Sequence, residues 1–88
     1  MHKKNEREDP EDALLKLAKF HEQMWHYDEA LKCLRKLLSI SDDTEKKAYY
    51  ELYMGALMEK KEDFKAAVRH YRKALRLKPS NTPVLYFS

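Results

Sequence analysis

The sequence predicts an all-α protein built from two helix-turn-helix hairpins. The 88 residues include one glycine, whereas a protein of strands and tight turns uses glycine repeatedly in hairpins and bulges. Hydrophobic residues make up 43% of the chain, which is enough for a core and too much for a disordered protein. Along most of the chain these residues recur at i, i+3 and i+4, the spacing of one helical face. A chain of this length is expected to form one small domain.

The first expected element is a helix that begins at Pro10. Residues 1–9 carry one apolar side chain, Met1, and are predicted to be a disordered charged tail. Asp9 can cap the helix, and Pro10 fits the first turn because its missing N–H is not needed there. The apolar face of this helix reads Leu14, Leu17, Ala18, His21, Met24 and Trp25.

The second expected helix follows Asp28, which is predicted to cap it. Its apolar residues form a single stripe: Ala30, Leu31, Leu34, Leu37 and Leu38. The polar residues 39–44 are predicted to connect this hairpin to the next.

The third and fourth expected helices span about 44–61 and 64–77. The third carries apolar side chains on two sides, which predicts neighbours on more than one side. Asp63 can cap the fourth helix, and Pro79 is expected to stop it. The predicted core face of the fourth helix reads Phe64, Ala67, Val68, Tyr71, Ala74 and Leu75.

The chain repeats itself at an offset of 37 residues. Ala18 then falls on Gly55, and Tyr27 falls on Phe64. A small residue in the first helix of each hairpin allows two antiparallel backbones to approach closely, and Tyr27 and Phe64 are expected to plug the turn ends. The other matched pairs are Leu17 with Met54, Ala30 with Ala67, Leu34 with Tyr71 and Leu37 with Ala74.

At these residues the sequence resembles the tetratricopeptide repeat family. The second unit matches the family signature at Gly55, Met58, Phe64, Ala67, Tyr71, Ala74 and Pro79, and the first unit matches it at Leu14, Leu17, Ala18, Tyr27, Ala30, Leu34 and Leu37. Trp25 and Glu62 replace the usual turn glycine. The resemblance implies a short right-handed superhelix with repeats at 10–43 and 44–79. Residues 80–88 form a C-terminal tail that looks like the opening of a further repeat helix.

The resemblance also implies a function in protein–protein interaction, as a scaffold or adaptor. In this family the first helices of the hairpins line a concave groove that receives a peptide or helix. The corresponding residues here are Leu15, Lys19, Glu22, Gln23, Tyr49, Leu52, Tyr53, Ala56 and Lys60. An alternative is that Tyr49 and Tyr53 only pack against the neighbouring hairpin.

The fourth helix supports a second functional hypothesis, because it is strongly basic. Lys65, Arg69, Arg72 and Arg76 are spaced at i, i+4, i+7 and i+11 and therefore share one face. This face could bind an acidic protein or a nucleic acid. It could also be a solvated surface whose long side chains cover apolar atoms. The net charge of +3 does not by itself dictate a nucleic-acid partner.

The sequence lacks the patterns of an enzyme or a cofactor site. One glycine cannot supply a phosphate-binding loop. His21 and His26 are five residues apart, which is not metal-ligand spacing on one helical face, so no metal and no cofactor are expected. The single cysteine, Cys33, reads as a buried apolar residue in a reducing, cytoplasmic protein. No apolar run reaches the ~20 residues that span a bilayer.

The expected partner is another protein or peptide. No membrane partner is expected, and a nucleic acid is the less favoured alternative. Stacked repeats bury their faces only against neighbours, so two repeats predict a homodimer or a place in a longer array. The surface expected to be left open includes Tyr50, Met54, Leu57, Val68, Tyr71 and Leu75.

Overall fold

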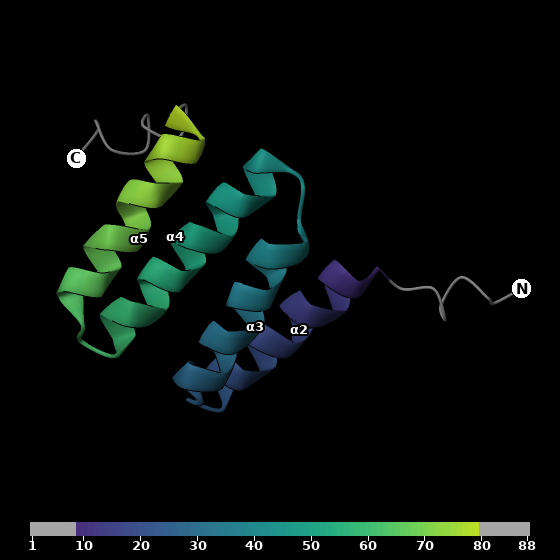
Figure 1. Ribbon diagram of the computed structural model, residues 1–88. Helices are drawn as coiled ribbons and strands as arrows, with labels where there is room; N and C mark the ends of the chain where they lie inside the picture. Colours follow the sequence, from purple (N-terminus) through teal and green to yellow (C-terminus); the bar gives the residue numbers. More distant parts are fainter. Residues whose placement is uncertain (1–8, 80–88) are drawn as a thin grey trace, which may run out of the picture. The chain divides into compact units, whose positions relative to one another are not determined.

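The computed structural model describes residues 9–79, and within them every regular element is a helix (Figure 1). The helices are α2 (Pro10–Gln23), α3 (Tyr27–Ile40), α4 (Thr44–Lys60) and α5 (Phe64–Leu77). The predicted all-α class of two helix-turn-helix hairpins is therefore confirmed. None of the described helices combines the length and apolarity needed to cross a membrane. The chain divides after Ile40 into two compact units.

The first unit is the hairpin of α2 and α3. The Asp9 carboxylate accepts a hydrogen bond of 3.0 Å from the Glu11 amide and so caps α2, as predicted. The core of this hairpin consists of fully buried residues: Ala18, Ala30, Leu31, Leu34 and Leu37. Cys33 is buried beside them, also as predicted.

Two expectations for the first unit are wrong. Asp28 does not cap α3, because the helix begins one residue earlier at Tyr27 and Asp28 lies in its first turn. There the carboxylate still interacts favourably with the helix dipole. The predicted apolar face of α2 is only partly buried, since Leu17, Met24 and Trp25 are largely exposed. A single neighbouring helix, α3, covers a narrower stripe than the periodicity defines.

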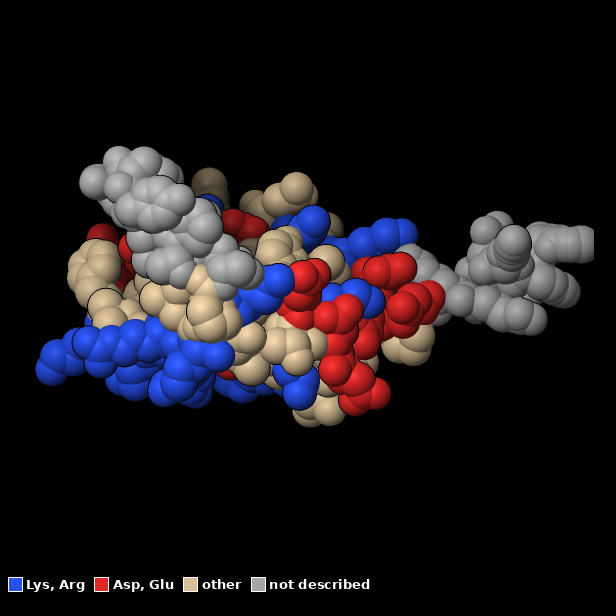
Figure 2. All heavy atoms as spheres, turned by 90° about the horizontal axis from the view of Figure 1, so that it is seen from above, with Lys and Arg blue, Asp and Glu red and all other residues tan. Residues whose placement is uncertain are grey.

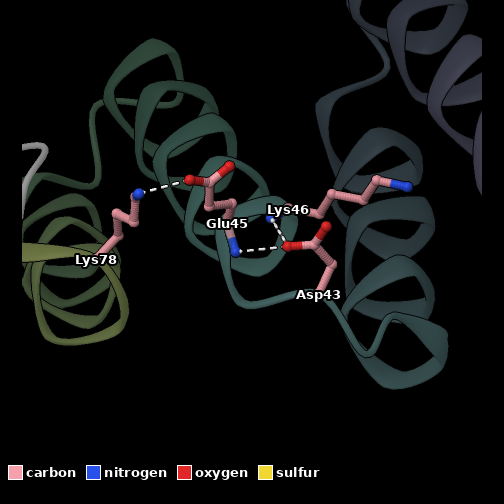
Figure 3. A network of polar contacts seen from close by, with 4 residues as sticks. All are labelled: Asp43, Glu45, Lys46 and Lys78. Atoms are coloured by element: carbon pink, nitrogen blue, oxygen red, sulfur yellow. Dashed lines mark hydrogen bonds and ion pairs between the residues drawn. The ribbon is translucent and has the colours of Figure 1, made fainter.

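The second unit is the hairpin of α4 and α5. The Asp43 carboxylate accepts from the amides of Glu45 at 2.9 Å and Lys46 at 3.4 Å, which caps α4 (Figure 3). Asp63 caps α5 through the Ala66 amide at 3.2 Å, as predicted. The helix ends at Leu77, two residues before Pro79.

Both hairpins turn through the same backbone motif. Trp25 and Glu62, 37 residues apart, are the non-glycine residues with positive φ in the described chain, at 62° and 65°. In each turn the following amide donates to the carbonyl five residues earlier, at 2.8 Å. This is the Schellman arrangement that ends helices, in which glycine is usual at the left-handed position. The turn geometry of the repeat is therefore kept without its glycine.

The close approach at Gly55 depends on Tyr71. A Cβ added to Gly55 would contact the Tyr71 ring and lie 2.6 Å from its Cδ1 atom. No real side chain tolerates such a distance without a shift of the ring. Gly55 therefore provides the space that the Tyr71 ring occupies between α4 and α5.

The expected position of Phe64 is wrong, and so is that of Val68. Phe64 is 61% exposed and does not plug the turn end of its hairpin, and Val68 is 45% exposed. Ala66, Ala67 and Ala74 are the buried side of α5. The face that carries Phe64 and Val68 lies to one side of this alanine face, beyond the reach of α4.

Candidate peptide-binding surface

The outer side of α2 carries a shallow hollow in the first unit. Its lining residues are Asp12, Leu15, Lys16 and Lys19. Leu15 is half-buried and Lys19 is exposed, so the first helix presents both residues where a ligand could contact them. Asp12 and Lys16 are additions that sequence reasoning missed. Two further candidates, Glu22 and Gln23, lie near the end of α2 and do not line the hollow.

A second hollow lies in the other unit, along α4 and the end of α5. Its lining residues are Glu45, Tyr49, Leu52 and Lys78. Glu45 and Lys78 form an ion pair of 2.5 Å that joins the start of α4 to the residue after α5 (Figure 3). The aromatic wall is extended by ring contacts of Tyr49 with Tyr53, whose centroids are 6.1 Å apart.

The two hollows share two lining positions of the repeat. Asp12 and Tyr49 are 37 residues apart, and so are Leu15 and Leu52. In each hairpin the first helix therefore offers a leucine, with charged side chains next to it. A leucine floor can accept an apolar side chain, and the flanking charges can pair with polar groups of an extended chain.

The remaining candidates on α4 lie outside its hollow. Tyr53 and Ala56 are half-buried, and Lys60 is exposed at the last residue of the helix. Tyr49 remains 44% exposed although it contacts two neighbouring tyrosine rings. It therefore keeps a free face for a ligand in the second unit.

The basic residues of α5 line a third hollow with apolar neighbours. Lys65, Arg69 and Arg72 surround the exposed Phe64 and Val68. Arg76 is exposed on the same helix but does not line this hollow.

Sequence reasoning missed a buried polar pair in the second unit. Glu51 is 6% exposed, and its Oε1 atom lies 2.8 Å from the Nδ1 atom of His70. The pair joins α4 to α5 and satisfies a carboxylate that would otherwise be costly to bury. The signal that could have found it is that Glu51 is the one charged residue in 48–58.

Two titratable groups, Cys33 and Tyr71, have raised pKa values. Burial raises the pKa of the Cys33 thiol, Glu29 raises it further, and Lys36 partly opposes the shift. Burial also raises the pKa of Tyr71, together with the charge of Glu59 and a hydrogen bond to it. Both groups therefore stay neutral over the physiological range. The described residues include no cluster of three His, Cys, Asp or Glu side chains arranged for a metal ion.

Comparison with protein families identifies the chain. The family model of the tetratricopeptide repeat protein 21 C-terminal ARM domain matches residues 1–87. The chain belongs to this family. The resemblance to tetratricopeptide repeat proteins is confirmed, and the two hairpins are helical repeats of a tetratricopeptide repeat protein 21 C-terminal ARM domain. This family is a scaffold-type helical repeat domain and is not a known enzyme family. Comparisons with curated proteins and with solved structures gave no significant match.

Proposed function

We propose that the chain is a scaffold or adaptor module that binds an extended peptide or a helix of another protein along the first helices of its repeats. It acts by binding and carries out no catalysis of its own. The predicted contact residues are Leu15, Lys19, Glu22, Gln23, Tyr49, Leu52, Tyr53, Ala56 and Lys60.

One observation carries this proposal: the first helix of each hairpin lines a hollow, and the two hollows share two repeat positions. Leu15 in α2 and Leu52 in α4 line these hollows. Both leucines are half-buried, so part of each side chain stays open to a ligand. Repetition of a side-chain pocket is what a ligand with regularly spaced apolar residues requires.

A displayed-peptide selection against the whole chain tests the proposal. Peptides that bind are synthesised, and their dissociation constants are measured by fluorescence anisotropy for the wild type and for Leu15→Ala and Tyr49→Ala. We expect each substitution to weaken binding by about tenfold, the loss typical of an anchoring contact.

The matched control is Phe20→Ala, which removes another exposed ring of α2 that lies outside both hollows. Its affinity should stay within about twofold of the wild type. Selected peptides whose affinity is unchanged by both Leu15→Ala and Tyr49→Ala would contradict the proposal.

Self-association and location are further parts of the proposal. We expect two chains to pair through their C-terminal hairpins, or the hairpins to continue in a longer array, because stacked repeats bury their faces only against neighbouring repeats. The predicted contribution of residues 80–88 lies outside the described residues. The buried thiol of Cys33 supports a reducing, cytoplasmic setting.

A further inference from the structure

The solvent side of α5 combines an apolar pair with a row of cations. Phe64 and Val68 are one helical turn apart and lie beside Lys65, Arg69 and Arg72 in a single hollow. We name these five residues the α5 surface. Figure 2 shows Lys and Arg side chains gathered at the side of the view where Figure 1 places α5.

The corresponding helix of the first repeat lacks this combination. At the positions of Lys65, Arg69, Arg72 and Arg76, α3 has Asp28, Lys32, Arg35 and Ser39. The equivalent of Val68 is Leu31, which is 1% exposed, whereas Val68 is 45% exposed. The second helix of the first repeat thus carries mixed charge, whereas that of the second repeat is almost uniformly basic and leaves Val68 exposed.

The cations of the α5 surface have no carboxylate of their own. Within residues 9–79, neither Lys65, Arg69 nor Arg72 forms an ion pair. The one acidic residue in 63–78 is Asp63, and its carboxylate accepts the hydrogen bond from the Ala66 amide that caps α5. The positive charge beside the apolar pair is thus uncompensated. Repulsion among the cations is unfavourable for the isolated hairpin, and the same charges attract an anionic partner.

We propose that the α5 surface is a second docking site, which binds an acidic amphipathic helix of a partner protein. Apolar side chains one turn apart on that helix cover Phe64 and Val68. Carboxylates that flank them pair with Arg69 and Arg72, whose planar guanidinium groups match a carboxylate with two parallel hydrogen bonds. This site is separate from the proposed peptide-binding hollows.

The apolar pair favours a helix over a nucleic acid. A phosphate backbone would pair with the cations but would leave Phe64 and Val68 in water. Burial of both side chains requires a ligand with apolar groups at matching spacing, and an amphipathic helix provides them at i and i+4. The carboxylates of an acidic helix would also pair with the basic residues of the α5 surface, whereas an uncharged apolar helix would leave these cations unpaired.

The test uses the full chain and a defined probe. The probe is a fluorescein-labelled, end-blocked 18-residue helical peptide with leucines on one face and glutamates on both flanks. A second peptide has every glutamate replaced by glutamine. Fluorescence anisotropy gives the dissociation constants. We expect the glutamate peptide to bind at least about tenfold more tightly than the glutamine peptide, and this ratio to shrink as salt is raised.

Paired variants locate the site. Phe64→Ala and Arg69→Glu should each weaken binding of the glutamate peptide by at least about tenfold. Their controls are Phe20→Ala, an exposed ring on α2, and Lys73→Glu, an exposed cation of α5 outside the hollow. Both controls should stay within about twofold of the wild type. Circular dichroism verifies that each variant keeps its helices.

Several results would overturn the proposal. Equal affinity for the glutamate and glutamine peptides would show that charge has no role, and equal losses in Arg69→Glu and Lys73→Glu would show that only net charge matters. Tighter binding of single-stranded DNA or of phosphatidylserine vesicles, lost in Phe64→Ala, would assign the surface to those ligands. Concentration-dependent dimerisation abolished by Phe64→Ala would assign it to a second copy of the chain.

Discussion

The two hairpins have the same helix-turn-helix backbone but carry different residues at the positions of Gly55 and Tyr71. At the positions equivalent to Gly55 and Tyr71, the first hairpin has Ala18 and Leu34, and both residues are fully buried. The second places Gly55 against the ring of Tyr71. A smaller residue on the first helix is thus matched by a larger one on the second. The two pairs therefore have similar total side-chain volumes although both residues differ.

A second pair of equivalent positions differs in polarity. The first hairpin has Leu14 and Cys33 where the second has Glu51 and His70. Cys33 is buried as a neutral thiol, whereas Glu51 is buried through its contact with His70. The same site of the repeat therefore holds apolar residues in one hairpin and a hydrogen-bonded polar pair in the other.

The largest expected effect is that of Gly55→Val. The new side chain would overlap the Tyr71 ring, so we expect the free energy of unfolding to fall by about 3 kcal/mol. Urea denaturation followed by circular dichroism measures the loss. If Gly55→Val unfolds at the same urea concentration as the wild type, the close approach described for this hairpin is wrong.

A double-mutant cycle at the same contact tests volume matching. Gly55→Ala should destabilise the wild type by about 1 kcal/mol because its methyl group meets the ring. In a Tyr71→Leu background, which copies the pair of the first hairpin, it should stabilise by about 1 kcal/mol through helix propensity. The coupling energy is then about 2 kcal/mol. A coupling near zero would mean that the two residues do not share this space.

Removal of one partner of the buried polar pair should cost about 2 kcal/mol. Glu51→Leu leaves His70 without its carboxylate in a partly buried site. The double variant Glu51→Leu with His70→Cys copies the first hairpin and should recover most of the loss. A Glu51→Leu variant as stable as the wild type would show that the contact contributes nothing, and a double variant no more stable than Glu51→Leu would show that the unpaired His70 is not the cause of the loss.

A smaller gain is expected at the turn. Glu62 has a φ of 65°, a conformation that costs a non-glycine residue about 1 kcal/mol. Glu62→Gly should relieve this strain and raise the free energy of unfolding by up to about 1 kcal/mol, less the entropy that glycine adds to the unfolded chain. Thermal melts of Glu62→Gly beside an exposed helical control, Lys73→Gly, measure it. Destabilisation by both substitutions alike would argue against strain at the turn.

The smallest effect is a dependence of stability on alkaline pH. The pKa of Tyr71 is raised in the folded state from its ordinary value of 10.0. The neutral phenol therefore contributes stability below pH 10 that is lost as the pH rises through the folded pKa. Between pH 9 and pH 11 the wild type should lose more stability than Tyr71→Phe. Tyr49→Phe, at an exposed ring, should lose as much as the wild type.

Local signals in the sequence predicted most of the fold. Asp9 and Asp63 mark helix starts because a side-chain cap acts within three residues, and Pro79 follows the last helix because proline cannot continue one. Periodicity indicated that α5 has an apolar face, but it does not specify how far a neighbour covers that face. Phe64 and Val68 were for this reason assigned to the core and are instead exposed.

The candidate surface was predictable only in part. Leu15 and Leu52 follow from the repeat, since equivalent positions of a repeat share an environment. The ion pair of Glu45 with Lys78 and the contact of Glu51 with His70 join residues 33 and 19 positions apart. Such pairs depend on the packing of α4 against α5, which no local pattern encodes.

Chemical-shift perturbation tests the central claim, that equivalent positions of both first helices receive the ligand, most directly. A selected peptide is titrated into the ¹⁵N-labelled chain, and the amide shifts are mapped. We expect the largest changes to fall in two stretches, residues 12–19 and 45–56, and to saturate together. Changes confined to one of these stretches, or to 30–38 of α3, would contradict it.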